Sequence, residues 1–406
     1  MKRKGKKKAL GNNYVFGIMV IVLISIVSVF WLKRNDVPVV TPLTSEEVET
    51  QDKEAERINK MIYDTDVELM RLGNEDLKKT GGKNQQMFNK LRTNLQMATD
   101  SYENLLDLRY NGIRVNTEEE RFADLLSAAR IGDVKMTDET LSNLLSSLST
   151  QKNLMYVRAV VAAGPSIPAS VPAINQAPGS GYRRQKVTVG GRSYLVDIQA
   201  ADLNSTKVIV DTASDGTCTD NCPVLPLGTY VSRSGAYAGV NGTYFCPDTY
   251  PSCAGKKNSF DILVMNKNKV YFNSDNNVFS TVPAAIFSPG SARFVTTSRE
   301  WGRDTGVDSV IANRPLLTFN GAIMTGGGEA KENIRGNRSF VGSTGNTVYI
   351  GVVRSASIVE VAKVLQTIGV QNAINLDNGG STAFWSGGYK AGPGRRIPNA
   401  VLFVQR

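Results

Sequence analysis

The chain has 406 residues, enough for two or three domains, and its 41% hydrophobic and 21% charged residues are ordinary for a globular protein. It contains no histidine, which excludes a Ser-His-Asp triad, a Cys-His catalytic pair and any histidine-ligated metal site. The net charge of +10 comes mostly from basic residues near the amino terminus. These are Lys2, Arg3, Lys4, Lys6, Lys7, Lys8, Lys33 and Arg34. Because the remainder is nearly neutral, we expect no nucleic-acid partner.

An uncharged apolar segment follows the basic tail at residues 14–32. A helix of this length spans the hydrocarbon core of a bilayer, about 30 Å. Most of the flanking basic residues precede it, so the positive-inside rule places the amino terminus in the cytoplasm. The alternative is a cleaved signal peptide, but the run is long for one and no clear cleavage site follows Leu32. We therefore expect a single-pass cell-membrane protein whose carboxy-terminal domain is extracellular.

Apolar residues recur at helical spacing between residues 33 and 163. One stripe of this kind contains Met87, Leu91, Leu95, Ala98, Tyr102 and Leu105. A heptad pattern is not sustained, so a helical stalk or bundle is predicted rather than a long coiled coil. No residue in this region indicates a particular partner. Residues 164–182 are rich in Pro, Gly, Ser and Ala, which is typical of a semi-rigid linker.

Short strand patterns replace the helical ones from residue 183 to residue 406. The pair Gly190-Gly191 separates two alternating segments and indicates a β-hairpin. The expected fold is an α+β carboxy-terminal domain, a mixed sheet with helices, preceded by the helical region and one transmembrane helix. The expected domains are a basic tail at 1–13, the transmembrane helix at 14–32, the stalk or bundle at 33–163, the linker at 164–182 and the carboxy-terminal domain at 183–406.

All four cysteines lie in the carboxy-terminal domain, at positions 218, 222, 246 and 253. They allow three disulfide pairings. We favour Cys218 with Cys222 and Cys246 with Cys253, because each bridge then closes a small loop. A four-cysteine zinc site is the alternative, and the extracellular location favours disulfides over it.

The segment 373–382 contains the clearest candidate site. An apolar run at 373–376 enters it, and Asp377, Asn378, Gly379, Gly380, Ser381 and Thr382 follow. Adjacent glycines allow positive φ and a close approach of a ligand to the backbone amides. A buried strand at 347–353 and an amphipathic helix precede the segment, and Ser357 and Glu360 have the spacing of a capping box. The order strand, helix, strand and glycine-rich loop predicts a ligand site at the end of the last strand, although an ordinary turn remains the alternative.

Four sequence blocks in residues 185–406 resemble those of the phosphodiester glycosidase family. This family is named for the enzyme that removes N-acetylglucosamine from its phosphodiester link to mannose. The blocks are Asn241-Gly242-Thr243-Tyr244-Phe245, Arg338-Ser339-Phe340-Val341-Gly342, Leu376-Asp377-Asn378-Gly379-Gly380-Ser381 and Arg395-Arg396-Ile397-Pro398-Asn399-Ala400. Asn378 departs from the pattern, because it stands where the family usually has glycine.

The resemblance implies a glycosidase that cleaves sugar-1-phosphodiester bonds in cell-surface glycans or glycopolymers. The candidate catalytic residues are Asp377, Asn241 and Glu360. The candidate substrate or phosphate ligands are Arg338, Ser339, Asn378, Gly379, Gly380, Ser381 and Asn399. Arginine can hold phosphate through two parallel hydrogen bonds, and carboxylates act at the anomeric carbon in glycoside cleavage. Glu360 has a capping role as its alternative, and Asn241 a turn role.

The sequence shows no required cofactor and leaves the need for a divalent cation open. Two other functions remain open as well. The same site could bind a phosphorylated glycan without cleaving it, an interpretation that the departure at Asn378 supports. Alternatively, the chain could be a structural envelope protein that acts through its helical region.

Overall fold

The computed structural model describes residues 45–110, 115–161, 167–274, 280–303, 306–325 and 333–406. The expected membrane anchor at 14–32 lies outside these residues and stays a prediction. Within the described ranges, no helix is both long and apolar enough to cross a membrane.

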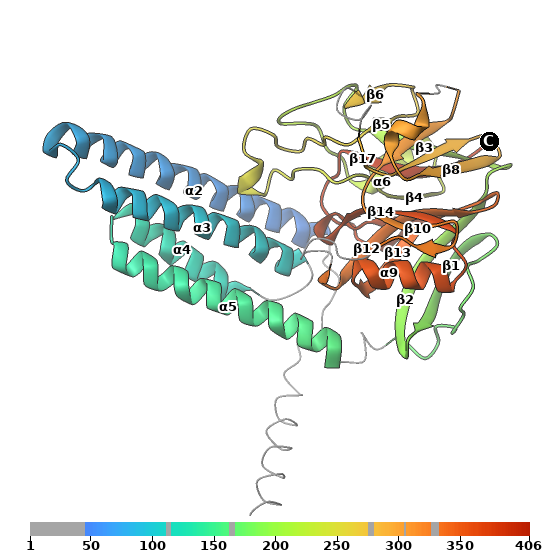
Figure 1. Cartoon of the computed structure of the whole chain (residues 1–406), viewed down its shortest axis with the longest axis horizontal. Coiled ribbons are helices and arrows are strands. Elements are labelled where there is room, and N and C mark those ends of the chain that lie inside the picture. Colours follow the sequence, from blue (N-terminus) through green and yellow to red (C-terminus); the bar gives the residue numbers. More distant parts are fainter. Residues whose placement is uncertain (1–44, 111–114, 162–166, 275–279, 304–305, 326–332) are drawn as a thin grey trace, which may run out of the picture. The chain divides into compact units, whose positions relative to one another are not determined.

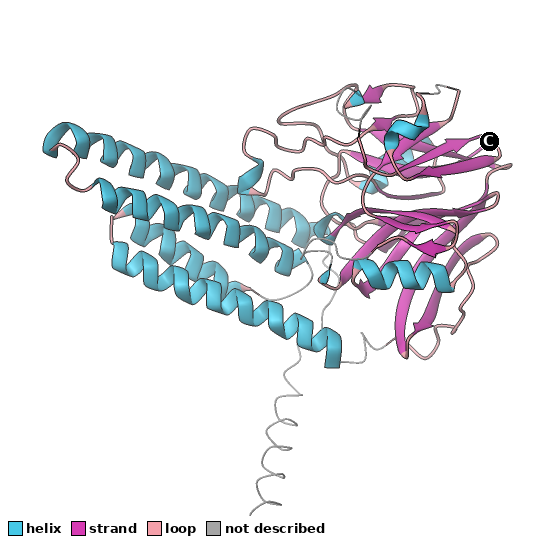
Figure 2. Cartoon of the chain, viewed as in Figure 1, coloured by secondary structure: helices cyan, strands magenta, loops and turns pink. Residues whose placement is uncertain are grey.

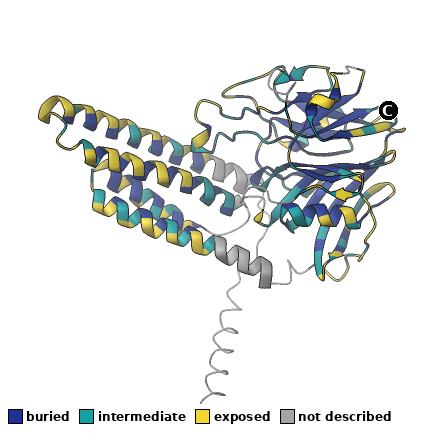
Figure 3. Ribbon diagram, viewed as in Figure 1, coloured by how far each residue is buried: buried dark blue, intermediate teal, exposed yellow. Residues whose placement is uncertain are grey.

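The amino-terminal part of the described chain is helical (Figure 1). Its helices are α2 (Ser45–Thr80), α3 (Gln85–Tyr110), α4 (Asn116–Arg130) and α5 (Val134–Val161). They lie side by side and each buries one apolar face, so exposed and buried residues alternate along the parts of these helices that Figure 3 colours by burial. The rings of Tyr102 and Phe122 stack within this helical core, with their centroids 4.9 Å apart. The helical pattern read from the sequence therefore forms a bundle with its own core.

The rest of the described chain is rich in β-strands, which form three sheets (Figure 2). The first sheet has the order β1 (Gly181–Val189), β2 (Arg192–Asp202), β13 (Thr347–Ala356), β12 (Gly336–Thr344), β14 (Asn372–Asn378), β10 (Leu316–Phe319) and β11 (Ala322–Ile323). The second has the order β16 (Tyr389–Ala391), β15 (Phe384–Ser386), β4 (Ala238–Asn241), β17 (Asn399–Gln405) and β3 (Thr206–Thr212). The third has the order β6 (Tyr271–Phe272), β5 (Val264–Met265), β9 (Ser309–Ala312), β7 (Ala284–Ser288) and β8 (Ser291–Val295).

The expectation of a mixed sheet was wrong, because the named strands of the described residues all pair in antiparallel fashion. The strand–helix–strand order itself is present as β13, α9 (Ile358–Thr367) and β14. However, β12 lies between β13 and β14 and pairs with both. Two strands joined by a crossover helix can therefore run in the same direction inside an antiparallel sheet.

The first sheet is covered on both faces. Phe340 packs with Val361 and Leu365 of α9, whereas the next residue, Val341, packs in the core that the first sheet shares with the second. This alternation follows from the strand geometry, which points successive side chains to opposite faces. The second sheet is covered on its other side by α6 (Leu227–Ser234). The end of β14 is thus held between two buried layers.

Several local signals were confirmed. Gly190 and Gly191 adopt φ of +58° and +79° in the turn between β1 and β2. Ser357 and Glu360 form the expected capping box of α9, with the Glu360 N–H donating to Ser357 Oγ at 3.3 Å and the Ser357 N–H donating to Glu360 Oε2 at 2.8 Å. Part of the expected linker also docks on the β-rich domain, since the Ile174 N–H donates to the Lys186 carbonyl at 3.0 Å.

Candidate active site

The segment 377–381 follows the central strand β14 and turns into a short 3-10 helix, η3 (Gly379–Ser381). Gly379 has φ of +62°, so the left-handed conformation expected for this loop is at this glycine. The Asp377 carboxylate accepts hydrogen bonds from the Asn378 N–H, at 2.8 Å, and from the Ser381 hydroxyl. The loop therefore folds back on Asp377, which is half-buried.

The Asp377 carboxyl has a perturbed pKa. Loss of solvation raises this pKa from 3.8 to about 6, although the Ser381 hydroxyl, the Arg395 charge and the Asn378 N–H all oppose the rise. A carboxyl with this pKa is mostly ionised at neutral pH but takes up a proton in mildly acidic solution. Perturbed carboxyls of this kind concentrate at functional sites.

Asn241 lies at the end of β4 and joins three strand ends through its side chain, which is fully buried. Its Nδ2 donates to the Asp377 carbonyl at 2.7 Å. Its Oδ1 accepts from the Ser339 hydroxyl at 2.7 Å and from the Ala383 N–H at 3.0 Å. These contacts are all internal, so the geometry favours Asn241 as a support of the Asp377 backbone.

Asn378 takes the place of the family's usual glycine without distorting the loop. Its backbone is extended, with φ of −131° and ψ of −173°, a conformation that any residue adopts. Its side-chain Oδ1 accepts from the Ser339 N–H at 3.0 Å, and its Nδ2 donates to Asn375 Oδ1 at 3.0 Å. The amide thus ties β14 to β12, and no glycine is needed here.

Arg395 is a residue of the site for which the sequence had suggested no role. It is 6% exposed, and its N–H donates to the Gly380 carbonyl at 2.8 Å. Its guanidinium is close enough to Asp377 to oppose the rise in the pKa of that carboxyl, and it lies over the ring of Tyr250, 5.1 Å from the centroid. In the sequence, the only indication of Arg395 was its place as the first residue of the fourth block. Nothing in the sequence indicated Tyr250.

Arg338 and Ser339 lie on β12, next to the end of β14, where Arg338 is in register with Asn378. The Arg338 side chain donates to the main-chain carbonyls of Ala356, at 3.3 Å, and Ile334. Ser339 is fully buried between Asn241 and Asn378. The first three sequence blocks thus come together at the end of β14.

Glu360 lies at the start of α9, where it forms an ion pair with Arg335 in addition to the capping box. Burial tends to raise its pKa, but hydrogen bonds from Arg335, the Ser357 N–H and Tyr194 outweigh this effect and lower the pKa to about 2. Such a carboxyl stays ionised and engaged at neutral pH. The geometry favours its structural role over a catalytic one.

Asn399 begins β17 and is fully buried. Its Oδ1 accepts from the Thr243 N–H at 2.9 Å, and its Nδ2 donates to Thr243 Oγ1 at 2.9 Å. A Cβ on Gly242 would lie 1.8 Å from Asn399 Oδ1, so the glycine of the first block is required by this close approach. Asn399 therefore clamps the first block to the fourth.

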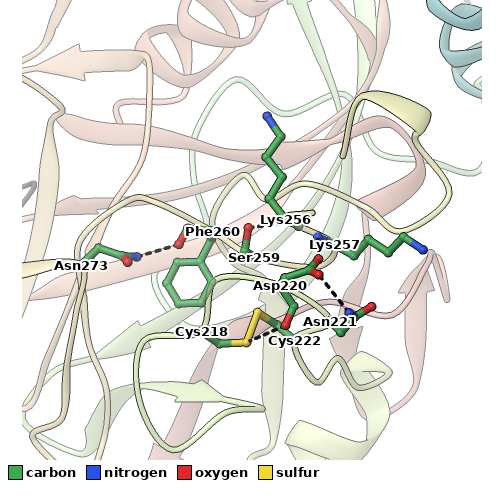
Figure 4. Close-up of a disulfide and its surroundings, with 9 residues drawn as sticks. All are labelled: Cys218, Asp220, Asn221, Cys222, Lys256, Lys257, Ser259, Phe260 and Asn273. Carbon is green, nitrogen blue, oxygen red and sulfur yellow. Dashed lines mark hydrogen bonds between the residues drawn. A yellow bond between two sulfur atoms is a disulfide. The ribbon is translucent and has the colours of Figure 1, made fainter. Parts of the chain in front are cut away.

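The four cysteines form the two local disulfides, Cys218–Cys222 and Cys246–Cys253, as preferred from the sequence. Figure 4 shows the first bridge beside residues 256–260. There the Cys222 N–H donates to the Lys257 carbonyl at 3.0 Å, and the Lys257 N–H donates to Asp220 Oδ1 at 2.7 Å. The second bridge closes the loop that contains Tyr250. Of the two loops, it is this second one that contacts the site, through the Tyr250 ring under Arg395.

In the ranges that the structure describes, no group of three or more Cys, Asp or Glu residues could hold a metal ion. The candidate site instead combines one carboxylate of raised pKa, a buried arginine and a glycine loop. An anionic ligand with hydroxyl groups matches these features, because arginine and backbone amides bind phosphate oxygens.

Comparison with solved structures finds similar proteins. The chain is similar to a solved hypothetical protein from Synechocystis, at 13% identity and a TM-score of 0.39 over 55% of this chain and 62% of that one. It is also similar to the catalytic domain of zebrafish N-acetylglucosamine-1-phosphodiester alpha-N-acetylglucosaminidase, solved as auto-inhibited by its pro-peptide, at 18% identity and a TM-score of 0.43 over 58% and 87% of the two chains. No curated protein matches the chain.

The sequence profile of the phosphodiester glycosidase family matches residues 234–404. The match begins later than the resemblance expected from residue 185, and it omits the helical region. It includes β4, β12, β14 and β17, whose ends build the site around Asp377. Residues 234–404 therefore form a domain of the phosphodiester glycosidase family.

Proposed function

We propose that the protein is a membrane-anchored, exported glycosidase that hydrolyses sugar-1-phosphodiester bonds in cell-surface glycans or glycopolymers. One observation carries this proposal: the Asp377 carboxyl lies beside Arg395 at the end of β14, within the segment that matches the family. A phosphodiester-linked sugar needs both an acidic group at its anomeric carbon and a cation at its phosphate.

The proposed reaction breaks the bond between the anomeric carbon and the phosphate oxygen. Water supplies the hydroxyl of the released sugar, and the phosphate leaves as a monoester while one proton passes to the site or the solvent. At neutral pH Asp377 is mostly ionised, which suits attack on the anomeric carbon or activation of the water. Phosphate is already a good leaving group, so the step needs little protonation of the leaving oxygen by a general acid.

Phosphate recognition is proposed for Arg395 and Arg338, with the Gly379-Gly380 backbone and the Ser381 hydroxyl as further donors. Arg338→Lys keeps the charge but loses the planar fork of the guanidinium. It should raise the KM for a phosphodiester while the melting temperature stays close to that of the wild type. If the KM is unchanged, Arg338 does not hold the phosphate.

The test of the activity uses the full chain in detergent with a synthetic N-acetylglucosamine-1-phosphodiester. Phosphorus NMR should show conversion of the diester to a phosphomonoester, and Asp377→Asn should abolish it. The same sugar linked through phosphate at a non-anomeric carbon serves as the control substrate. Binding of the diester without turnover would overturn the enzyme proposal and favour a glycan-binding module.

Membrane anchorage is proposed from the charge pattern around residues 14–32 alone. Protease added to intact cells should remove the carboxy-terminal domain and leave a short membrane-bound fragment. Protection of that domain, in cells whose known surface proteins are cleaved, would overturn the proposed topology.

A further inference from the structure

Helix α3 of the bundle contacts the loop that the Cys246–Cys253 bridge closes. The Tyr250 hydroxyl donates a hydrogen bond to Asp107 Oδ1, and the Ser252 N–H donates to Glu103 Oε1 at 2.8 Å. Glu103 and Asp107 are four residues apart and therefore lie on the same face of the helix. Two acidic side chains of one helical turn thus hold the disulfide-closed loop.

Tyr250 reaches from this contact into the candidate active site. Arg395 lies over its ring and also donates a hydrogen bond to its hydroxyl oxygen. The backbone of Arg395 is in turn bonded to the Gly380 carbonyl of the glycine loop. A continuous series of contacts therefore runs from Asp107 through Tyr250 and Arg395 to the loop that folds back on Asp377.

The hydrogen bonds along this series of contacts have a defined direction at the Tyr250 hydroxyl. Burial and the adjacent Asp107 raise the pKa of the Tyr250 hydroxyl well above its usual range, so that this hydroxyl stays protonated and acts as a donor to Asp107. The Tyr250 oxygen is then oriented with its lone pairs away from Asp107, toward Arg395. Hydrogen bonds linked in this way polarise and fix one another.

We propose that helix α3 supplies Asp107 as a second acidic group of the active site, where it positions Tyr250 and Arg395 for the sugar phosphate. The helical region then belongs to the catalytic unit and is more than a spacer. This inference rests on the proposed function, and it assigns to Asp107 the role of a positioning residue.

A ligand can reach Tyr250 from the side of the bundle. A cavity of about 840 Å³ opens beside this tyrosine, and its volume lies within the range of small-molecule sites. Its walls come from α2, α3, the disulfide-closed loop and the neighbouring residues 221–222 and 254–258. Beside charged groups such as Lys60 and Arg92, they include Asn59, Tyr63, Gln96, Thr99, Asp248 and Tyr250. Amide and hydroxyl groups with an aromatic ring suit a sugar, which presents both hydroxyls and an apolar face.

The test compares Asp107→Asn with Glu103→Gln in the full chain. Both variants remove one carboxylate charge from the same face of α3, but Asp107 accepts its hydrogen bond from the Tyr250 hydroxyl, whereas Glu103 accepts one from the Ser252 N–H. Asp107→Asn should lower kcat about 10- to 100-fold, the size expected when a reacting group loses its alignment. Glu103→Gln should stay within about twofold of the wild type, and both variants should melt close to it.

A pH profile separates positioning from a purely structural role. The Ser381 hydroxyl, the Asn378 N–H and the Arg395 charge lower the pKa of the Asp377 carboxyl, and the more remote Asp107 charge raises it. Asp107→Asn should therefore move the limb of the profile that reports Asp377 to lower pH, whereas Glu103→Gln should leave it in place. Equal profiles in the two variants, or faster turnover in Asp107→Asn, would overturn the inference.

The outcome is readable even if the enzyme proposal fails. In that case the wild type binds N-acetylglucosamine-1-phosphate in calorimetry but turns nothing over. The pH at which this binding is half-maximal is then measured in place of the pH dependence of turnover. This midpoint should shift in Asp107→Asn but not in Glu103→Gln. An unshifted midpoint in both variants would remove Asp107 from the site.

Discussion

The side-chain amide of Asn241 donates to the main-chain carbonyl of Asp377 at 2.7 Å and so joins the end of β4 to the end of β14. These residues lie on two different sheets. The candidate site is therefore built where the sheets meet, and its precision depends on buried amides as much as on the loop.

Asn241→Ala should destabilise the fold. It leaves the Asp377 carbonyl and the Ser339 hydroxyl without their buried partner, at a cost of roughly 1–3 kcal/mol for each group. Denaturant unfolding should show this loss together with reduced turnover. An unchanged midpoint with lost turnover would instead give Asn241 a direct role toward the substrate.

Asp377→Asn should remove turnover while the fold is retained. The amide keeps the shape of the side chain but cannot act as a nucleophile or base. We therefore expect kcat to fall about 10²- to 10⁴-fold. Circular dichroism provides the control for folding. Turnover equal to that of the wild type would exclude Asp377 from the mechanism.

The same substitution should change stability with a distinctive pH dependence. The folded-state pKa of about 6 lies above the ordinary 3.8, so the folded protein retains a proton that the unfolded chain has lost between these values. The stability of the wild type therefore falls as pH rises from about 4 to 6, relative to Asp377→Asn. The variant should unfold at a higher temperature at pH 7.5, and this advantage should disappear below pH 4. An advantage that is independent of pH would contradict the raised pKa.

Glu360→Gln should show the opposite pH dependence. The folded-state pKa of about 2 lies below the ordinary 4.5, so the carboxylate stabilises the fold above pH 4.5, and this stabilisation is lost as pH falls toward 2. At neutral pH the variant should melt at a lower temperature than the wild type, and this difference should become smaller in acid. Turnover should change little, because Glu360 is engaged with Arg335 and the start of α9. A large loss of kcat with an unchanged melt would restore Glu360 as a catalytic candidate.

The two disulfides should differ in their effect on activity. Both close short loops, so replacing either pair by serine should cost about 2 kcal/mol or less of stability. Removal of Cys246–Cys253 should also raise KM or lower kcat, since this loop carries Tyr250 to Arg395. Removal of Cys218–Cys222 is the matched control and should affect turnover less. Equal effects on turnover would argue against a special role of the Tyr250 loop.

Local features of the fold were readable from the sequence. The Gly190-Gly191 hairpin, the capping box of Ser357 and Glu360, and the short-range disulfides each depend on residues close together in the chain. The glycine loop after β14 was readable for the same reason, since an apolar strand and two glycines determine where the chain turns. These features are decided by local geometry, which sequence spacing records directly.

Contacts between distant segments were decided only by the tertiary structure. No spacing indicates that β12 inserts between β13 and β14, that Asn241 supports Asp377, or that Asp107 and Tyr250 meet 143 residues apart. The raised pKa of Asp377 is of the same kind, because solvation is lost only when the loop, Arg395 and their neighbours pack around the carboxyl. The sequence by itself determined the chemical groups available to this site, whereas packing determined which of them meet and with what charge.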